Sequence, residues 1–419
     1  MVIQVPKRSR PGVVPEAGAH SNQRNGACHA RKLGRAGGQG RIIPASSRLD
    51  GRGIPELSWA GRKSLPHAAS RRLFCQDKQQ GLGEAKVESV NTKDTVLVTG
   101  GAGYIGSHVV LALLDAGRRP VVLDDLSTGR RSMVPAGVPF VEGSVGDAGL
   151  VADTLGCHGI GTVMHFAGSI VVPESVERPL DYYRNNTVNS HALIVACLKA
   201  GVERFIFSST AAVYGMPDRL PIDEETATAP INPYGASKLM TEWMLRDAAA
   251  AHGLRYVALR YFNVAGADPQ GRSGQISKVA THLIKIAAQT VTGQRSEIAV
   301  FGDNYPTADG TCVRDYIHVS DLATAHVAAL AHLETGGANQ ILNCGYGKGC
   351  SVREVLAMVE AVTGKPLPMR IAARRPGDPP ALVAGVERIR ATLDWTPRFD
   401  DLETIVSTAL AWERRLAGQ

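Results

Sequence analysis

The sequence lacks any uninterrupted apolar run of the roughly 18–20 residues that a membrane span requires. Aromatic residues make up only 5% of the chain, but hydrophobic residues make up 44% and charged residues 20%, which is enough apolar surface for a buried core. The length of 419 residues is long for one domain and suits two. These features predict a soluble protein without a membrane partner.

Cysteine is scarce and scattered. The seven cysteines stand at positions 28, 75, 157, 197, 312, 344 and 350. They form no Cys-x-x-Cys pair, and no histidine cluster accompanies them. The odd count and irregular spacing argue against a disulfide framework and against zinc. We therefore expect reduced thiols, no metal site and a cytoplasmic location.

The positive charge is confined to the beginning of the chain. Residues 1–80 hold 15 basic and 4 acidic residues, a net charge of about +11. The remaining residues hold 31 basic and 35 acidic residues, a net charge of about −4, so the formal charge of +7 does not describe the body of the protein. The basic composition therefore does not indicate a nucleic-acid partner.

Residues 1–92 have no hydrophobic period and are rich in Gly, Arg, Pro and Ser. We interpret them as a basic leader outside the fold. Three origins stay open: a disordered segment, an organelle transit peptide, or a start codon set ahead of the true one. Frequent Gly and Pro disfavour the amphipathic helix that a transit peptide needs.

From Thr95 onward, short apolar runs alternate with helical patterns. The runs are Thr95–Thr99, Val121–Asp124, Thr162–Phe166, Arg204–Ser208 and Arg255–Tyr261, and the helical patterns include Tyr182–Ala200, Ser237–His252, Val352–Thr363 and Leu402–Leu416. This alternation predicts an α/β fold with a Rossmann-type doubly wound parallel sheet. We expect this domain over residues 93–265 and a smaller C-terminal lobe over 266–419. The lobe would close over the carboxyl edge of the sheet, where such sheets bind ligands.

A glycine-rich turn follows the first predicted strand. Gly100, Gly103 and Gly106 stand between that strand and a helical pattern, which is the context of a dinucleotide site. The glycines allow a tight turn, close approach of the pyrophosphate, and packing of helix on strand. Asp124 ends the next strand, where a carboxylate binds the ribose hydroxyls of NAD and repels the 2′-phosphate of NADP. The turn therefore predicts NAD as cofactor.

Tyr234 and Lys238 stand four residues apart, which places them on one face of a helix. A free tyrosine has a pKa of ~10, so its use as a base near neutral pH requires a drop of roughly 3 units. We expect the ammonium of Lys238 and the positive nicotinamide ring to lower this pKa. Ser208 and Thr210 end the preceding strand, where a hydroxyl can bind the reacting sugar. The set predicts a tyrosine-based oxidation of a sugar hydroxyl.

Seven segments resemble the extended short-chain dehydrogenase/reductase family, and within it the UDP-hexose 4-epimerases. They are Thr99–His108, His165–Gly168, Pro233–Lys238, Arg260–Asn263, Asp309–Thr311, Val313–Val319 and Arg374–Asp378. The resemblance implies an NAD-dependent epimerase that inverts C4 of a UDP-hexose, UDP-glucose or UDP-galactose, through a transient 4-keto sugar. It makes residues 93–265 the NAD-binding domain with the catalytic helix, and 266–419 the UDP-sugar lobe. It also allows residues 313–332 to return to the first domain.

The resemblance implies site residues by position. The catalytic residues are Tyr234, Lys238 and Thr210. The cofactor-binding residues are Gly100, Gly103, Tyr104, Ile105, Gly106, Asp124, Asp125, Leu126, Ser144, Val145, Phe166, Ala167, Gly168, Asn185, Ser208, Tyr234, Lys238 and Phe262. The substrate-binding residues are Thr210, Tyr234, Asn263, Arg314, Arg375 and Asp378. Arginine suits bidentate binding of the UDP diphosphate. The resemblance also implies a homodimer through the helices of Tyr182–Ala200 and Ser237–His252.

Single positions distinguish the other activities found in this family. A 4,6-dehydratase would carry an Asp-Glu pair after the serine strand, but this chain has Ala211 and Ala212 there. A 4-epimerase of UDP-xylose and UDP-arabinose stays open. So does a non-catalytic NAD-sensing protein, although such a protein is expected to lose Tyr234 or Lys238. The resemblance implies that Leu382 occupies the position that controls access of N-acetylated sugars, and its branched side chain predicts their exclusion.

Overall fold

The structure is a computed structural model that describes residues 95–277, 281–375 and 377–418. The predicted leader over residues 1–92 lies outside these residues. No helix within the described ranges is long and apolar enough to cross a membrane. Four of the cysteines, Cys197, Cys312, Cys344 and Cys350, are free thiols, and the first three are buried.

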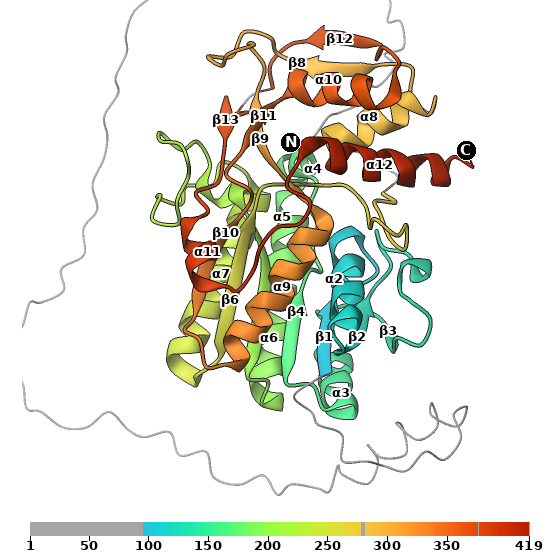
Figure 1. Cartoon of the computed structure of the whole chain (residues 1–419). Coiled ribbons are helices and arrows are strands. Elements are labelled where there is room, and N and C mark those ends of the chain that lie inside the picture. Colours follow the sequence, from blue (N-terminus) through green and yellow to red (C-terminus); the bar gives the residue numbers. More distant parts are fainter. Residues whose placement is uncertain (1–94, 278–280, 376, 419) are drawn as a thin grey trace, which may run out of the picture. The chain divides into compact units, whose positions relative to one another are not determined.

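A seven-stranded parallel sheet forms the centre of the fold (Figure 1). Its strands are β1 (Thr95–Thr99), β2 (Arg119–Asp124), β3 (Phe140–Glu142), β4 (Thr162–His165), β5 (Arg204–Thr210), β6 (Arg255–Tyr261) and β10 (Gln340–Cys344). The spatial order is β10-β6-β5-β4-β1-β2-β3, and every neighbouring pair is parallel. The order reverses between β1 and β4, which creates the crevice where doubly wound sheets bind ligands. The predicted fold class is therefore confirmed.

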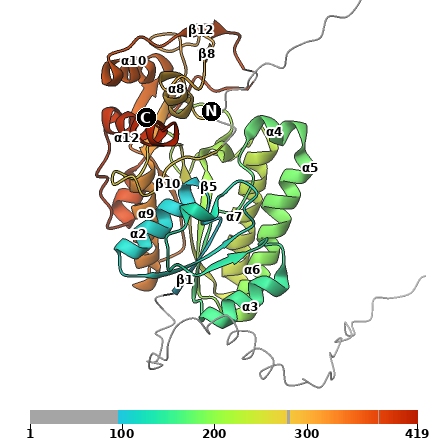
Figure 2. The same cartoon turned by 90° about the vertical axis from the view of Figure 1, so that its right-hand side faces the viewer.

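Helices cover both faces of this sheet (Figure 2). They are α2 (Tyr104–Asp115), α3 (Ala148–His158), α4 (Val172–Glu177), α5 (Pro179–Tyr182), the π-helix η3 (Tyr183–Val188), α6 (Asn189–Ala200), α7 (Pro233–His252) and α9 (Val319–Glu334), with the short 3-10 turns η2 (Arg131–Met133) and η4 (Ala211–Tyr214). The side chains of β1 alternate between two cores. Val96 and Val98 pack with α2 and α9, and Leu97 packs with α3 and α6. This period of two explains why the buried strand reads as a continuous apolar run.

The C-terminal part adds a second group of elements beyond the sheet edge (Figure 1). They are β7 (Asn263–Ala265), α8 (Leu283–Val291), β8 (Ile298–Phe301), β9 (Val313–His318), β11 (Gly349–Ser351), α10 (Val352–Thr363), β12 (Met369–Ala372), β13 (Ala381–Leu382) and α12 (Leu402–Leu416). Three elements of the predicted lobe, α9, β10 and α11 (Glu387–Thr392), instead pack on or join the large sheet. The division of the chain into two functional domains stays a prediction.

Two predicted helices differ from the structure, one at its start and one inside its length. The apolar pattern begins at Ser237 and the spacing of Tyr234 and Lys238 places Tyr234 on the same helix, and α7 begins at Pro233. Asn232 caps it by accepting from the backbone N–H of Gly235 at 2.8 Å, and proline is favoured in the first turn. The pattern at Tyr182–Ala200 is helical throughout, but η3 interrupts its α-helical hydrogen bonding. Tyr234 therefore lies in the first turn of α7.

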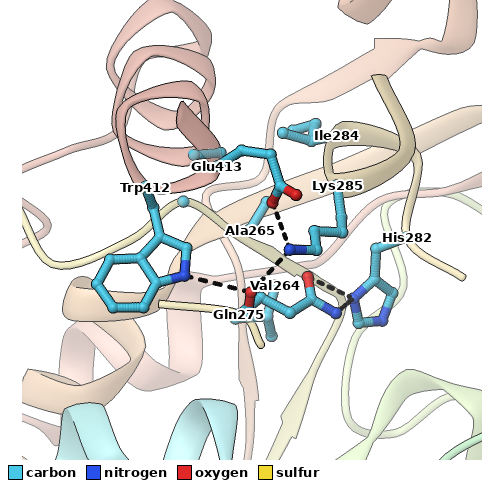
Figure 3. A pocket seen from close by; sticks show the side chains of 10 residues that line it. Val264, Ala265, Gln275, His282, Ile284, Lys285, Trp412 and Glu413 are labelled. Carbon is cyan, nitrogen blue, oxygen red and sulfur yellow. Dashed lines mark hydrogen bonds and ion pairs between the residues drawn. The ribbon is translucent and has the colours of Figure 1, made fainter. Parts of the chain in front are cut away.

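A buried polar cluster joins α8 to α12 away from the large sheet (Figure 3). Lys285 donates to Glu413 and to the carbonyl oxygen of Gln275, at 2.9 Å for the latter. Trp412 donates to the same carbonyl at 3.2 Å, and Gln294 donates to Glu413 at 2.7 Å. Both ionised side chains are at most 6% exposed. The cluster lines a cavity of about 20 Å³.

Candidate active site

The predicted site residues gather at the carboxyl edge of the large sheet. Parallel strands all end at the same edge, so the turns after β1, β2, β4 and β5 lie together there. The glycine turn approaches the segment after β4 closely, because a Cβ on Gly100 would lie 2.6 Å from the backbone nitrogen of Ala167. In Figure 2 the elements β8, β12, α8, α10 and α12 lie beyond this edge.

The glycine turn forms an open cradle at the start of α2. Gly100 has a φ of +70°, a left-handed conformation that favours glycine. A Cβ on Gly106 would lie 2.2 Å from the carbonyl oxygen of Gly100, so only glycine fits the contact between turn and helix. The helix has no side-chain cap at Gly103 and no acidic residue in its first turn. Its N–H groups and dipole therefore suit an anionic pyrophosphate.

Asp124 is held at the end of β2 by backbone donors. Its two carboxylate oxygens accept from the N–H groups of Ala102 at 2.9 Å and Leu126 at 2.8 Å. Burial raises the pKa of Asp124, and these hydrogen bonds act in the opposite direction. Leu126 adopts a φ of 57°, the one left-handed non-glycine residue in the described ranges. Such conformations cost energy and occur often beside ligands.

Tyr234, Lys238 and Thr210 meet where α7 packs against the end of β5. All three side chains are buried, with exposed fractions of 8%, 3% and 8%. Lys238 donates to the carbonyl oxygen of Ser208 at 2.9 Å, and its ammonium lies 5.0 Å from the ring centre of Phe207. The hydroxyl of Ser208 is paired with Tyr261, which sequence reasoning did not single out. The structure therefore brings the predicted tyrosine, lysine and hydroxyl residues together.

The pKa of Tyr234 is raised by burial, and the interaction with Thr210 lowers it only in part. The sequence argument expected Lys238 and the nicotinamide ring together to lower this pKa, but among the protein's own residues burial is the larger influence and raises it. The ammonium of Lys238 donates to the Ser208 carbonyl. Burial also lowers the pKa of Lys238 to about 8, which weakens the positive charge available above that pH.

The turn after β4 is fixed by an asparagine that sequence reasoning missed. Asn186 accepts from the N–H of Ser169 at 2.7 Å and donates to its carbonyl oxygen at 2.9 Å. It also donates to the hydroxyl of Ser237 at 3.1 Å. The predicted residue, Asn185, is half-buried and donates to the hydroxyl of Ser169 at 2.9 Å. The π-helix η3 adds one residue to the turn, so helical periodicity does not identify which asparagine points inward.

A second cluster lies on the C-terminal elements. Arg314 is 2% exposed and donates to Asp378 at 2.5 Å. The guanidinium of Arg375 lies 3.9 Å from the ring centre of Phe301, and burial lowers its pKa to about 10. Within the described residues, Nη2 of Arg375 and Oδ2 of Asp378 are buried without hydrogen-bond partners. Buried polar atoms are almost always paired, so this cluster suits a bound anion with hydroxyl groups.

The two clusters are connected through β9 and β13. Leu382 lies opposite Arg314 in the β13–β9 pair and packs with Phe262 against the core around Tyr214. Asn263 lies opposite Tyr316 in the β7–β9 pair. Both sets of residues therefore border the same region of the fold.

Several of the predicted cofactor-binding residues contact other parts of the protein itself. Tyr104 donates to the carbonyl oxygen of Gly266 at 2.6 Å. Ser144 accepts from the N–H of Gly146 at 3.1 Å, and Val145 is buried in the core beside β2. The carboxylate of Asp125 is exposed and accepts from Ser127. These contacts do not prevent cofactor binding, and the roles of the residues stay predictions.

Comparison with known proteins identifies the family of the chain. The sequence matches the NAD dependent epimerase/dehydratase family over residues 96–345. The chain belongs to this family. The UDP-glucose 4-epimerase of Azospirillum brasilense is 64% identical over 321 residues, which cover 77% of this chain and 92% of that protein.

Two solved structures extend the comparison. The UDP-glucose 4-epimerase from Brucella ovis in complex with NAD is 48% identical, with a TM-score of 0.74 over 76% of this chain and 98% of that one. The UDP-glucose 4-epimerase from Stenotrophomonas maltophila, with bound NAD and formylated UDP-arabinopyranose, is 39% identical. Its TM-score is 0.75 over 77% of this chain and 99% of that one. The relatives therefore agree with the resemblance seen in the sequence motifs.

Proposed function

We propose that the protein is an NAD-dependent epimerase that interconverts UDP-glucose and UDP-galactose by inverting C4 of the hexose. The observation that carries this proposal is the meeting of Tyr234, Lys238 and Thr210 at the sheet edge that also holds the glycine turn. The carboxylate pair that sugar dehydration requires is replaced by Ala211 and Ala212. The family membership and the UDP-glucose 4-epimerase relatives support the same reaction.

The residues at the crevice fit NAD. Gly100, Gly103 and Gly106 would bind the pyrophosphate at the start of α2, and Asp124 would bind the adenosine ribose hydroxyls. The carboxylate of Asp124 would repel a 2′-phosphate, which favours NAD over NADP. When bound, NAD would supply the hydride chemistry at C4 and a positive charge at the site. A Cβ added at Gly168 would lie 3.8 Å from the Lys238 ammonium. The glycine would therefore let the cofactor approach that charge.

The protein's own residues move the proton. Tyr234 would take the proton from the 4-hydroxyl of the sugar when that hydroxyl is oxidised, and return it to the same oxygen when the keto group is reduced. With NAD bound, the ammonium of Lys238 and the positive nicotinamide ring would together favour the ionised phenol, against the effect of burial. Thr210 binds the oxygen that loses and regains the proton, because its hydroxyl lies beside the phenol. Burial of all three excludes water from the transferred proton.

The second cluster would hold the UDP part of the substrate. Arg314 and Arg375 would bind the diphosphate, and the buried unpaired Nη2 of Arg375 supplies a donor for it. Asp378 would accept from a ribose hydroxyl through the oxygen that has no partner within the described chain. Asn263 lies on β7 between the two clusters and would contact the diphosphate or the sugar edge.

Substrate preference is the first test of this proposal. We expect separate incubations with UDP-glucose, UDP-xylose and UDP-N-acetylglucosamine to convert only UDP-glucose at an appreciable rate, with the sugar configuration read by NMR. The branched side chain of Leu382 is the reason for exclusion of the N-acetyl group. Faster conversion of UDP-xylose would assign a pentose 4-epimerase. No conversion of any sugar, with NAD still bound, would assign a non-catalytic NAD-sensing protein.

A homodimer is the proposed assembly, and the cytoplasm is the proposed location. Large hydrophobic side chains are exposed on packed helices at one side of the sheet: Leu180 on α5, Val188 on η3 and Trp243 on α7, with exposed fractions of 78%, 57% and 46%. Large exposed apolar side chains on neighbouring helices are typical of subunit interfaces. The buried free thiols support the cytoplasmic location.

The dimer face is tested by adding charge to it. We expect the protein to elute with twice the chain mass of 44.4 kDa, and Leu180→Glu and Trp243→Glu to convert it to a monomer. Met369→Glu is the matched control, because Met369 is also exposed, at 42%, but lies on β12 in the other part of the fold. Light scattering after size exclusion measures the mass. An unchanged dimer in both helix variants would exclude this face.

A further inference from the structure

A fully buried ion pair lies behind the catalytic end of β5. Glu242 on α7 and Arg260 on β6 are 1% and 5% exposed in their side chains. They form two hydrogen bonds, Nε to Oε1 at 3.0 Å and Nη2 to Oε2 at 2.6 Å. Arg260 also donates to the hydroxyl of Tyr214 at 2.9 Å, and Tyr214 donates to Asn343 at 2.7 Å. The proposed proton-transfer mechanism uses none of these groups.

The pair connects the strand and the helix that carry the reacting groups. Tyr234, Lys238 and Glu242 follow one another at four-residue spacing, so they share one face of α7. Ser209 donates to Oε1 of Glu242, and Lys238 donates to the carbonyl oxygen of Ser208. Two consecutive residues of β5 are thus tied to successive turns of α7. The next residue of the strand, Thr210, interacts with Tyr234.

Such a pair is a poor source of stability. Transfer of two charges from water into the interior carries a large desolvation cost, and well-packed apolar residues in their place are often neutral or stabilising. Buried charge pairs are retained in some proteins because they fix one geometry. The bidentate geometry here admits one separation of α7 from the strand pair β5–β6, because three donors converge on a single carboxylate.

We infer that Ser209 and Glu242 are positioning residues, which set the separation between Thr210 on β5 and Tyr234 on α7 and thereby the rate of proton transfer. This inference rests on the proposed epimerase function. The Ser209 hydroxyl is the informative group, because its removal breaks the link between strand and helix but leaves the ion pair of Glu242 and Arg260 intact. The site can then be loosened without leaving a buried charge unpaired.

The test compares two single hydroxyl deletions in the full-length protein with its bound NAD. Ser209→Ala removes the link between β5 and α7. Tyr214→Phe is the matched control, because it removes one buried hydrogen bond on the other side of Arg260. We expect Ser209→Ala to lower kcat about tenfold with a KM within about twofold of wild type, since small misplacements of reacting groups are costly in kcat. Tyr214→Phe should keep kcat within about twofold, with a similar loss of thermal stability.

The outcomes separate the inference from the function on which it rests. Equal kcat values for Ser209→Ala and wild type, or equal losses in both variants, would overturn the positioning role. A lowered kcat in Ser209→Ala alone, at unchanged KM and NAD content, would support it. Ser209→Thr keeps the hydroxyl and should retain a higher kcat than Ser209→Ala. Wild-type protein without epimerase activity would instead refute the proposed function, whatever the variants do.

Discussion

Tyr234→Phe is expected to lower kcat by about 10²–10⁴-fold, the range that general acid–base catalysis contributes. The substitution removes one oxygen from a residue that is 8% exposed, so the fold and the cradle for NAD should persist. NAD content, measured after denaturation of the purified protein, should equal that of wild type. The conversion of UDP-galactose to UDP-glucose, followed by NMR, measures kcat.

The matched control is Tyr256→Phe. Tyr256 is also buried, at 6% exposure, but it lies at the beginning of β6, while the reacting groups lie at the carboxyl edge. This variant should keep its turnover. Wild-type turnover in Tyr234→Phe would refute the assignment of the base. An equal loss in both variants would show that the loss reports on packing and not on proton transfer.

Much of this site was predictable because its signals are local. The strand Thr95–Thr99 is buried on both faces and therefore reads as an apolar run, and it is observed with the predicted bounds. The glycines of the turn are dictated by sterics that any sequence must satisfy there. Tyr234 and Lys238 share a helix face by spacing alone. Features that depend on a single strand, turn or helix could therefore be predicted from the sequence.

The remaining features depend on contacts between distant segments. The inward asparagine is Asn186 because η3 changes the helical register, and the sequence carries no signal for that change. The pKa of Tyr234 is raised by burial, and the ammonium of Lys238 donates to the Ser208 carbonyl, a contact that spans 30 residues. The ion pair of Glu242 and Arg260 is visible only when α7 and β6 are seen together. The pKa shifts and buried ion pairs of the site therefore could not be predicted from the sequence alone.

The ion pair of Lys285 and Glu413 gives the second large expectation (Figure 3). Lys285→Met should lower the free energy of unfolding by about 3–5 kcal/mol, because it leaves the Glu413 carboxylate buried without its cation. Gln294 would still donate to Glu413, but a neutral amide does not balance the charge. Urea unfolding followed by far-UV circular dichroism measures the loss. The glycine turn and the residues around Tyr234 are not part of this cluster. The NAD content of the folded variant, measured without urea, should therefore equal that of wild type.

The control for charge and length is Lys348→Met, which removes an equivalent ion pair at the surface. Lys348 binds Asp400 at 2.7 Å, but the two side chains are 61% and 49% exposed, so its loss should cost at most about 1 kcal/mol. The double variant Lys285→Met with Glu413→Leu should recover most of the stability lost in Lys285→Met, because no charge is then left in the interior. A double variant as unstable as the single one would mean that the pair itself, rather than the unpaired carboxylate, holds α8 against α12. Equal losses in Lys285→Met and Lys348→Met would contradict the assigned burial, since only desolvation separates the two pairs.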